Sequence, residues 1–140
     1  MPEKIRAFVA VTLGEGVRSK ISELIETLRV APVRASWTKP ENLHLTLRFL
    51  GDVEPEVVDG LGVALRGSIE TATFRLGIRG IGVFPNRRRP QVIWNGIDGE
   101  LESLSALQAV VEQECQRLSL AAETRAYHPH VTMARIRKPE

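Results

Sequence analysis

A short motif that occurs twice places the strongest constraint on how this chain can fold. Residues 44–47 (His-Leu-Thr-Leu) and 130–133 (His-Val-Thr-Met) both read histidine, apolar residue, threonine, apolar residue. Each copy lies in a run that alternates as a β-strand does, and side chains two residues apart on a strand share a face. Each copy is therefore expected to bury its two apolar side chains and to present an imidazole and a hydroxyl together on the other face.

The distribution of histidine makes the pair informative. The chain has three histidines, His44, His128 and His130, and all three lie in or beside the two motifs. A single histidine on a strand is usually a partly buried, hydrogen-bonded residue, so one copy alone would indicate little. Two copies predict a pocket in which His44 and His130 converge, with Thr46 and Thr132 beside them as neutral hydrogen-bond donors.

Composition limits the classes of protein to consider. The 140 residues suit one domain, with 43% hydrophobic and 26% charged residues. No apolar run approaches the roughly 20 residues of a membrane span, and the start of the chain lacks the apolar core of a secretory signal. We therefore expect a cytoplasmic monomer. Cys115 is the only cysteine, which excludes an internal disulfide and a cysteine-based metal cluster.

The rest of the chain alternates between strand and helix patterns. Strands are predicted at residues 5–13, 36–38, 44–50, 73–83, 91–97 and 128–137, and helices at 17–29, from Glu54 onward and at 100–118. The first strand reads as buried on both faces, and Trp37 and Cys115 read as core residues. This order predicts an α+β fold, with one sheet or two facing sheets and with helices packed outside.

The two motifs and their surroundings resemble the two-histidine (2H) phosphoesterases. The residues that carry the resemblance are 40–51 (Pro-Glu-Asn-Leu-His-Leu-Thr-Leu-Arg-Phe-Leu-Gly) and 128–135 (His-Pro-His-Val-Thr-Met-Ala-Arg), with further similarity at 6–11, 82–85 and 92–94. The closest branch is the bacterial and archaeal RNA 2′,3′-cyclic phosphodiesterases, also called 2′-5′ RNA ligases. The resemblance implies a bilobal, pseudo-symmetric fold in which antiparallel sheets face a central groove. Members of this branch usually continue beyond the second motif, so residues 1–140 are expected to form a single 2H domain that lacks their C-terminal segment.

The resemblance also implies a reaction, the metal-independent hydrolysis of RNA 2′,3′-cyclic phosphate ends to 2′-phosphomonoesters. His44 would be the general acid that protonates the leaving 3′ oxygen, and His130 would be the general base that activates water. The residues by themselves leave this assignment of acid and base open. Imidazole suits both roles because both of its protonation states exist near neutral pH, so no cofactor is required. In reverse, the same pair would join RNA ends through a 2′-5′ linkage.

Four further side chains are expected to bind the phosphate. Thr46 and Thr132 would donate hydrogen bonds to its non-bridging oxygens. Arg48 shares strand parity with His44 and should face the pocket if the strand is regular. Arg135 matches an arginine of the family's second motif, although strict alternation places it on the face opposite His130 unless a bulge re-aims it.

The remaining candidates concern the RNA chain. Arg87, Arg88 and Arg89 form the basic tip of a predicted hairpin and could track RNA phosphates. Phe49 and Phe84 are candidates for stacking against a base. Phe49 shares a face with the apolar motif residues and reads as a core residue.

Three alternative interpretations stay open. His128, His130 and His44 could together hold zinc, since imidazole is a common zinc ligand, although this leaves the threonines without a role. The arginine loop could belong to a non-catalytic RNA-binding module. The enzyme could also act on small cyclic-phosphate nucleotides, such as a cyclic nucleotide or an ADP-ribose cyclic phosphate, in place of RNA.

Overall fold

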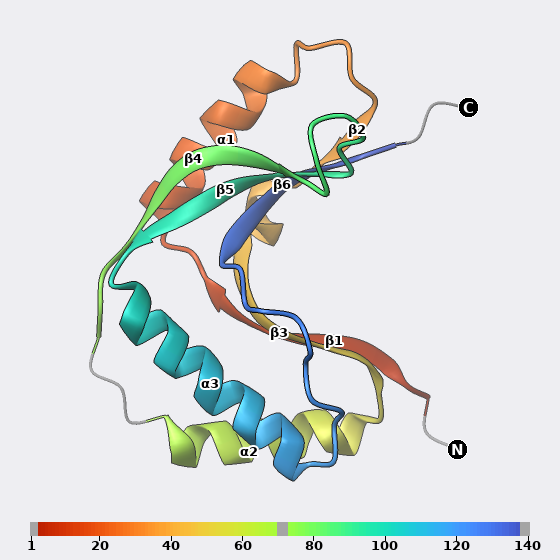
Figure 1. Ribbon diagram of the computed structural model, residues 1–140, viewed down its shortest axis with the longest axis vertical. Helices are drawn as coiled ribbons and strands as arrows, with labels where there is room; N and C mark the ends of the chain where they lie inside the picture. The colour runs from red at the N-terminus through yellow and green to blue at the C-terminus, as the bar shows by residue number, and fades with distance from the viewer. Residues whose placement is uncertain (1–2, 70–72, 138–140) are drawn as a thin grey trace. The chain divides into compact units, whose positions relative to one another are not determined.

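The computed structural model describes residues 3–69 and 73–137 and contains every helix and strand expected from the sequence (Figure 1). The strands are β1 (Ile5–Thr12), β2 (Ala35–Trp37), β3 (His44–Val53), β4 (Leu76–Phe84), β5 (Val92–Gly99) and β6 (His130–Ile136). The helices are α1 (Glu15–Leu28), α2 (Pro55–Ser68) and α3 (Leu101–Arg117), with a short 3₁₀ helix, η1 (Pro40–Asn42), before β3. Boundaries differ from the expected ones by a few residues.

The strands are hydrogen-bonded in the order β1-β3-β6-β5-β4, and β2 also pairs with β6. The pairings of β6 with β2, β3 and β5 are antiparallel. These features confirm the α+β class with antiparallel strands and helices. The expectation that the first strand is buried on both faces is wrong, because β1 ends the order and Ile5 and Phe8 are 42% and 46% exposed.

The chain divides into two compact units, each built from three separate stretches. Unit 1 consists of residues 1–10, 46–76 and 99–128, and unit 2 of residues 11–45, 77–98 and 129–140. The first histidine motif therefore begins in unit 2, and the second motif lies entirely within it.

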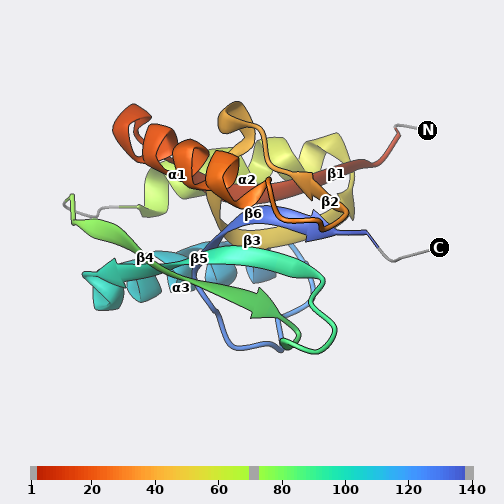
Figure 2. The same cartoon turned by 90° about the horizontal axis from the view of Figure 1, so that it is seen from above.

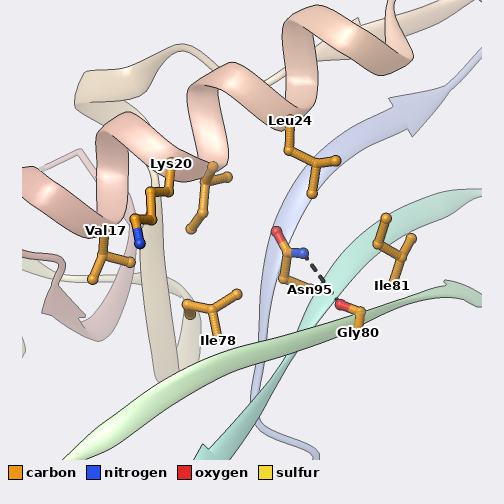
Figure 3. A pocket seen from close by; sticks show the side chains of 8 residues that line it. Val17, Lys20, Leu24, Ile78, Gly80, Ile81 and Asn95 are labelled. Carbon is orange, nitrogen blue, oxygen red and sulfur yellow. Dashed lines mark hydrogen bonds between the residues drawn. The ribbon is translucent and has the colours of Figure 1, made fainter.

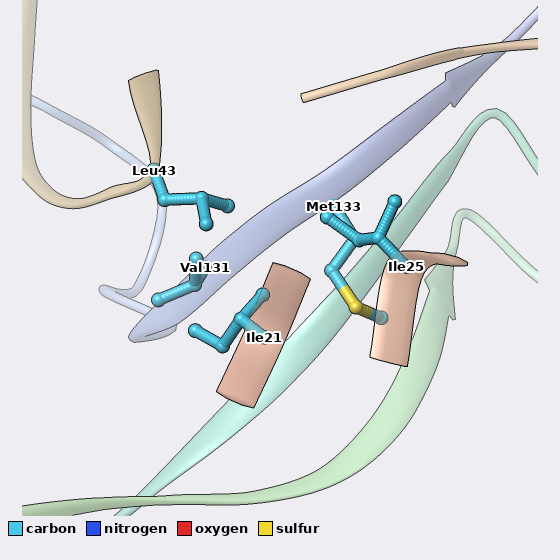
Figure 4. Packing of buried hydrophobic residues seen from close by; sticks show 5 residues of the cluster. All are labelled: Ile21, Ile25, Leu43, Val131 and Met133. Carbon is cyan, nitrogen blue, oxygen red and sulfur yellow. The ribbon is translucent and has the colours of Figure 1, made fainter. Parts of the chain in front are cut away.

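The core of unit 2 lies between α1 and the strands β4, β5 and β6, and Figure 2 shows α1 along one side of them. Ile21 and Ile25 of α1 pack with Leu43, Val131 and Met133 (Figure 4). The last two are the apolar residues of the second motif. Trp37 packs against the same cluster, so its predicted packing role is confirmed. Because α1 covers this face of β6, the alternating His130 and Thr132 side chains lie on its other face.

In unit 1, helices α2 and α3 pack against each other (Figure 1). Proline occupies the first turn of α2, where its missing N–H would have no intrahelical partner in any case. Among the described residues of this unit, the buried apolar ones are Leu47, Val53, Leu61, Leu104, Val111 and Cys115. Cys115 is fully buried on α3, which confirms it as a core residue, and burial raises the pKa of its thiol. Within the described residues, no helix is both long and apolar enough to span a bilayer.

Candidate active site

The two motifs lie on neighbouring antiparallel strands. Leu45 of β3 pairs with Val131 of β6, and both side chains are almost completely buried. The same register places His44 opposite Thr132, and parity places both on the face that the buried pair does not use. His130 shares that face because it precedes Thr132 by two residues. Diagonal neighbours on an antiparallel pair are typically about 7–8 Å apart, so His44 and His130 are close neighbours on this face.

The ring of His44 is held in one tautomer. Its Nδ1 atom lies 2.6 Å from the carbonyl oxygen of Asn42 in η1. A carbonyl oxygen can only accept a hydrogen bond, so Nδ1 must carry a proton. Nε2 is then the nitrogen that takes up or releases a proton, which is the arrangement that a general acid or base requires.

Two aromatic rings pack around His130. The Phe84 ring meets it edge-on with a centroid distance of 5.2 Å and an interplanar angle of 87°, and the Trp94 ring lies 6.1 Å away. Phe84 and Trp94 also contact each other, with centroids 5.0 Å apart. Trp94 pairs with Thr132, which places the indole on the motif face of the sheet. The sequence marked Phe84 only as a base-stacking candidate and gave no role to Trp94, because the contact depends on the register between β5 and β6.

The motif threonines are both anchored through their main chains. The hydroxyl of Thr38 donates to the carbonyl oxygen of Thr132 at 3.0 Å, within unit 2. The hydroxyl of Tyr127 donates to the carbonyl oxygen of Thr46 at 2.8 Å, within unit 1. The same position of each motif therefore accepts a bond from a hydroxyl on a distant segment, which fixes the strand without using the threonine side chain.

A β-bulge re-aims Arg135. Trp94 of β5 pairs with Thr132 of β6, whereas Ile93 of β5 pairs with Ala134. Between these two pairs, β6 therefore has one extra residue, Met133. Met133 and Ala134 are both buried, and the alternation resumes one step out of phase. Arg135, which pairs with Val92, therefore lies on the same face as Thr132 and is exposed. The regular alternation that would have hidden it does not apply.

Arg48 is tied into unit 1 and is only 8% exposed. Its Nε donates to Oε1 of Glu112 on α3, and its two terminal nitrogens donate to the carbonyl oxygens of Phe49 and Ala121, each at 2.6 Å. Although burial by itself lowers the pKa of Arg48, the hydrogen bond and charge of Glu112 raise it overall. The sequence predicted a pocket-facing position from strand parity, but Leu47 and Arg48 are consecutively buried, so burial does not alternate at this point of β3.

The same break in alternation exposes Phe49. Its side chain is 51% exposed and lies near Phe8, with ring centroids 5.9 Å apart. The interpretation of Phe49 as a core residue is therefore wrong. Its parity with Leu45 and Leu47 would bury it only in a strand without the break.

The arginine loop between β4 and β5 is exposed and ordered by a side chain. Arg87, Arg88 and Arg89 are all exposed. The Oδ1 atom of Asn86 accepts hydrogen bonds from the backbone N–H groups of Arg88 and Arg89, each at 3.0 Å. This turn fixes the main chain of the loop, so its arginines project from a defined backbone.

Two other features bear on possible ligands. Among residues 3–69 and 73–137, no group of three or more His, Cys, Asp or Glu side chains is arranged to hold a metal ion. A hollow of about 520 Å³ lies between α1 and strands β4 and β5, lined by Ile21, Ile78 and Asn95 among others (Figure 3). Asn95 pairs with Val131, so this hollow is on the α1 side of the sheet, away from the motif histidines.

Comparison with protein families gives a match to the model described as LigT-like phosphoesterase, over residues 11–94. An RNA 2′,3′-cyclic phosphodiesterase from Methanothermobacter thermautotrophicus is 38% identical over 137 residues, which cover 97% of this chain and 73% of that protein. A second protein of that name, from Thermus thermophilus, is 35% identical over 142 residues and is covered over 70% of its length.

Solved structures show the same similarity in three dimensions. The crystal structure of TT0787 of Thermus thermophilus superposes with a TM-score of 0.83 at 30% identity, covering 97% of this chain and 76% of that one. Escherichia coli LigT complexed with 3′-AMP gives a TM-score of 0.74 at 25% identity, covering 95% of this chain and 72% of that one.

Proposed function

Because the chain belongs to the LigT-like phosphoesterase family, we propose that it is an RNA 2′,3′-cyclic phosphodiesterase and that its two histidines act as an acid–base pair. The observation that carries the proposal is the pairing of Leu45 with Val131, which turns His44, His130 and Thr132 to one face of adjacent strands. The relatives named RNA 2′,3′-cyclic phosphodiesterase support the substrate class. We also propose that residues 1–140 work as one 2H domain and as a monomer.

The proposed reaction is an in-line displacement at phosphorus. His130 takes a proton from water as the water oxygen bonds to phosphorus. The bond between phosphorus and the 3′ oxygen breaks, and Nε2 of His44 gives its proton to that oxygen. The product is an RNA that ends in a 2′-phosphomonoester, and proton exchange with solvent restores the two imidazoles. Each proton transfer is worth roughly 10²–10⁴ in rate for a well-placed group.

The neighbouring residues would stabilise and orient this pair. The hydroxyl of Thr132, and by the equivalence of the motifs that of Thr46, would donate to the non-bridging oxygens on which negative charge sits. Arg135 would supply positive charge on the same face. Phe84 and Trp94 would hold the His130 ring in place. Arg48 would act through the fold of unit 1, because all three of its side-chain nitrogens are engaged there.

Two variations of the chemistry follow from the same arrangement. Run in reverse, the pair would join a 5′ hydroxyl to a cyclic phosphate and create a 2′-5′ linkage. A small nucleotide with a cyclic phosphate could also enter the site, a possibility favoured by the structural similarity to LigT crystallised with 3′-AMP. Comparing turnover of mononucleotide and oligonucleotide cyclic phosphates separates these substrate classes.

The decisive experiment measures hydrolysis of an RNA oligonucleotide with a 2′,3′-cyclic phosphate end. We expect His44→Ala and His130→Ala each to lower kcat/KM by at least about 100-fold, and we expect a bell-shaped pH profile for the unmodified protein. His128→Ala is the matched control, because that histidine is exposed and lies outside the pair. Turnover should persist when a metal chelator is present.

Three results would contradict the proposal. Near-normal turnover by either His44→Ala or His130→Ala would show that the two imidazoles are not the acid and base. Tight RNA binding without turnover of any cyclic phosphate would favour the non-catalytic RNA-binding module. Loss of turnover on chelation, restored by zinc, would favour the metal site.

A further inference from the structure

The charged residues are divided unevenly between the two units. Unit 2 contains 12 Lys and Arg against 6 Asp and Glu, whereas unit 1 contains 7 against 11. Within unit 2, the stretches 30–40, 77–97 and 129–137 contain eight basic residues and no acidic one. The small net charge of +2 for the whole chain therefore conceals a strongly basic unit that includes the candidate catalytic pair.

Basic side chains follow the motif face of β6 beyond Thr132. The bulge turns Arg135 to that face, where it pairs with Ser36 of β2. Arg137 follows, and its Nε atom donates to the hydroxyl of Ser36 at 3.2 Å while its backbone N–H bonds to the carbonyl of Arg34. Because Arg137 reaches the side chain that lies beside Arg135, the two arginines share a face. On this face, β6 therefore carries His130 and Thr132 and then the two arginines, Arg135 and Arg137.

The arginine loop is attached to the same end of β6. At the base of the loop, the N–H of Gln91 bonds to the carbonyl oxygen of Phe84, and the N–H of Ile136 bonds to the carbonyl oxygen of Gln91. These bonds place the base of the loop that carries Arg87, Arg88 and Arg89 next to the end of β6. The main chain of the loop is ordered by the side chain of Asn86, which accepts hydrogen bonds from backbone N–H groups and not from the guanidinium groups.

We propose that Arg87, Arg88, Arg89 and Arg137, which we call the arginine surface, bind the phosphates of single-stranded RNA upstream of its cyclic end. This inference rests on the proposed function and specifies its substrate as an oligonucleotide. A strand from His130 to Arg137 is about 20 Å long. This length is enough to contact several nucleotides of an RNA chain and exceeds what a single nucleotide covers. Guanidinium groups match phosphate oxygens in a bidentate manner and remain charged at any physiological pH.

The test compares one reactive end on RNA chains of different length. The substrates are a mononucleotide 2′,3′-cyclic phosphate and oligonucleotides of two, three and five residues with the same end. We expect kcat/KM to rise at least tenfold from the mononucleotide to the pentanucleotide. Changing Arg87, Arg88 and Arg89 together to Gln should raise KM for the pentanucleotide about tenfold and flatten its dependence on salt. Turnover of the mononucleotide should change less than twofold.

A charge-matched control distinguishes RNA binding at the arginine surface from a general effect of the protein's positive charge. Arg29, Arg66 and Arg75 are also exposed, but they lie at the C-terminal cap of α1, on α2 and in the segment before β4. Changing these three to Gln removes the same charge and should leave KM for the pentanucleotide within twofold. Equal effects of the two triple variants would overturn the inference, and so would equal kcat/KM values for all substrate lengths.

Failure of the proposed function gives a different result from failure of this inference. If the mononucleotide is hydrolysed but chain length has no effect, the reaction stands and the arginine surface does not bind RNA. If no cyclic phosphate is hydrolysed, binding of a labelled, single-stranded pentanucleotide with a 3′-phosphate still tests the surface. Weaker binding only in the loop variant then supports the surface, and unchanged binding overturns it.

Discussion

The indole of Trp94 lies directly against the α-carbon of Gly82 on the neighbouring strand β4. A Cβ atom at Gly82 would overlap the six-membered ring of Trp94 and lie 2.7 Å from its Cε2 atom. Only glycine leaves room for the indole in this position, because real Cβ atoms do not approach other atoms so closely. Trp94 in turn packs beside His130, so the absence of a side chain at Gly82 allows the ring contact with the proposed general base.

Gly82→Ala is therefore expected to impair catalysis without removing a catalytic group. The added methyl should push the indole aside at a cost of about 1–3 kcal/mol in the free energy of unfolding. The His130 ring would lose its fixed neighbour, so we expect kcat to fall about tenfold while KM for a mononucleotide cyclic phosphate changes little. Steady-state kinetics and urea unfolding measure the two effects.

Gly16→Ala provides the matched control for this change. Gly16 lies in the first turn of α1, where an added methyl group would point into open space, and alanine is the better helix former. The change should leave kcat unchanged and stability unchanged or slightly higher. If Gly82→Ala does not fold, Trp94→Phe tests the same contact with a smaller ring. Normal kcat in a folded variant of either kind would show that the contact does not position His130.

Arg48→Lys should weaken the fold more than it weakens substrate binding. One ammonium group cannot replace the three bonds that the guanidinium makes to Glu112, Phe49 and Ala121. Leaving buried acceptors without donors should lower the free energy of unfolding by about 2–3 kcal/mol, measured by urea denaturation. A raised KM with unchanged stability would instead return Arg48 to the phosphate site.

Arg117→Lys is the control for Arg48. Arg117 also pairs with a glutamate on α3, but its side chain is 64% exposed, so the change should cost less than about 0.5 kcal/mol.

Acid should reduce the difference in the free energy of unfolding between the Arg48→Lys variant and the unmodified protein. Burial alone would raise the pKa of Glu112, but the hydrogen bond and charge of Arg48 lower it below its ordinary value of 4.5. The stability from this ion pair is thus present above pH 4.5 and is lost as the pH falls through the lowered pKa.

The two motifs could be recognised from the sequence because each places a histidine and a threonine two residues apart in a run with the alternation of a strand. The pairing of Leu45 with Val131 puts His44 and His130 on one face of adjacent strands, while the convergence of their rings on one phosphate stays a prediction. The faces on which the following residues lie, such as Phe49 and Arg135, could not be predicted in the same way. Both β3 and β6 begin with the same burial pattern, in which the fourth and fifth residues are consecutively buried. Such a break moves Arg135 onto the motif face and Phe49 into solvent without any change in the pattern of residue types.

Other features depended on which segments become neighbours. The apolar residues of β1 suggested burial on both faces, but the position of β1 at the end of the strand order leaves Ile5 and Phe8 exposed. The contact between Trp94 and His130 required the register of β5 on β6. Local periodicity determines the face of a side chain within a strand, whereas strand order and register determine what that face meets.

Tyr127→Phe should change how stability depends on alkaline pH. Burial raises the pKa of the Tyr127 hydroxyl to about 12, and this hydroxyl donates to the carbonyl oxygen of Thr46. A tyrosine whose pKa is raised on folding contributes stability that is complete below its ordinary pKa of 10 and is lost as the pH rises toward 12. At pH 8 the variant should lose about 1 kcal/mol through the missing hydrogen bond. Its stability should then fall less steeply than that of the unmodified protein between pH 10 and 12. Urea unfolding at pH 8, 10 and 11 measures both effects, and parallel loss of stability in the two proteins across this range would show that the Tyr127 hydroxyl is not linked to folding.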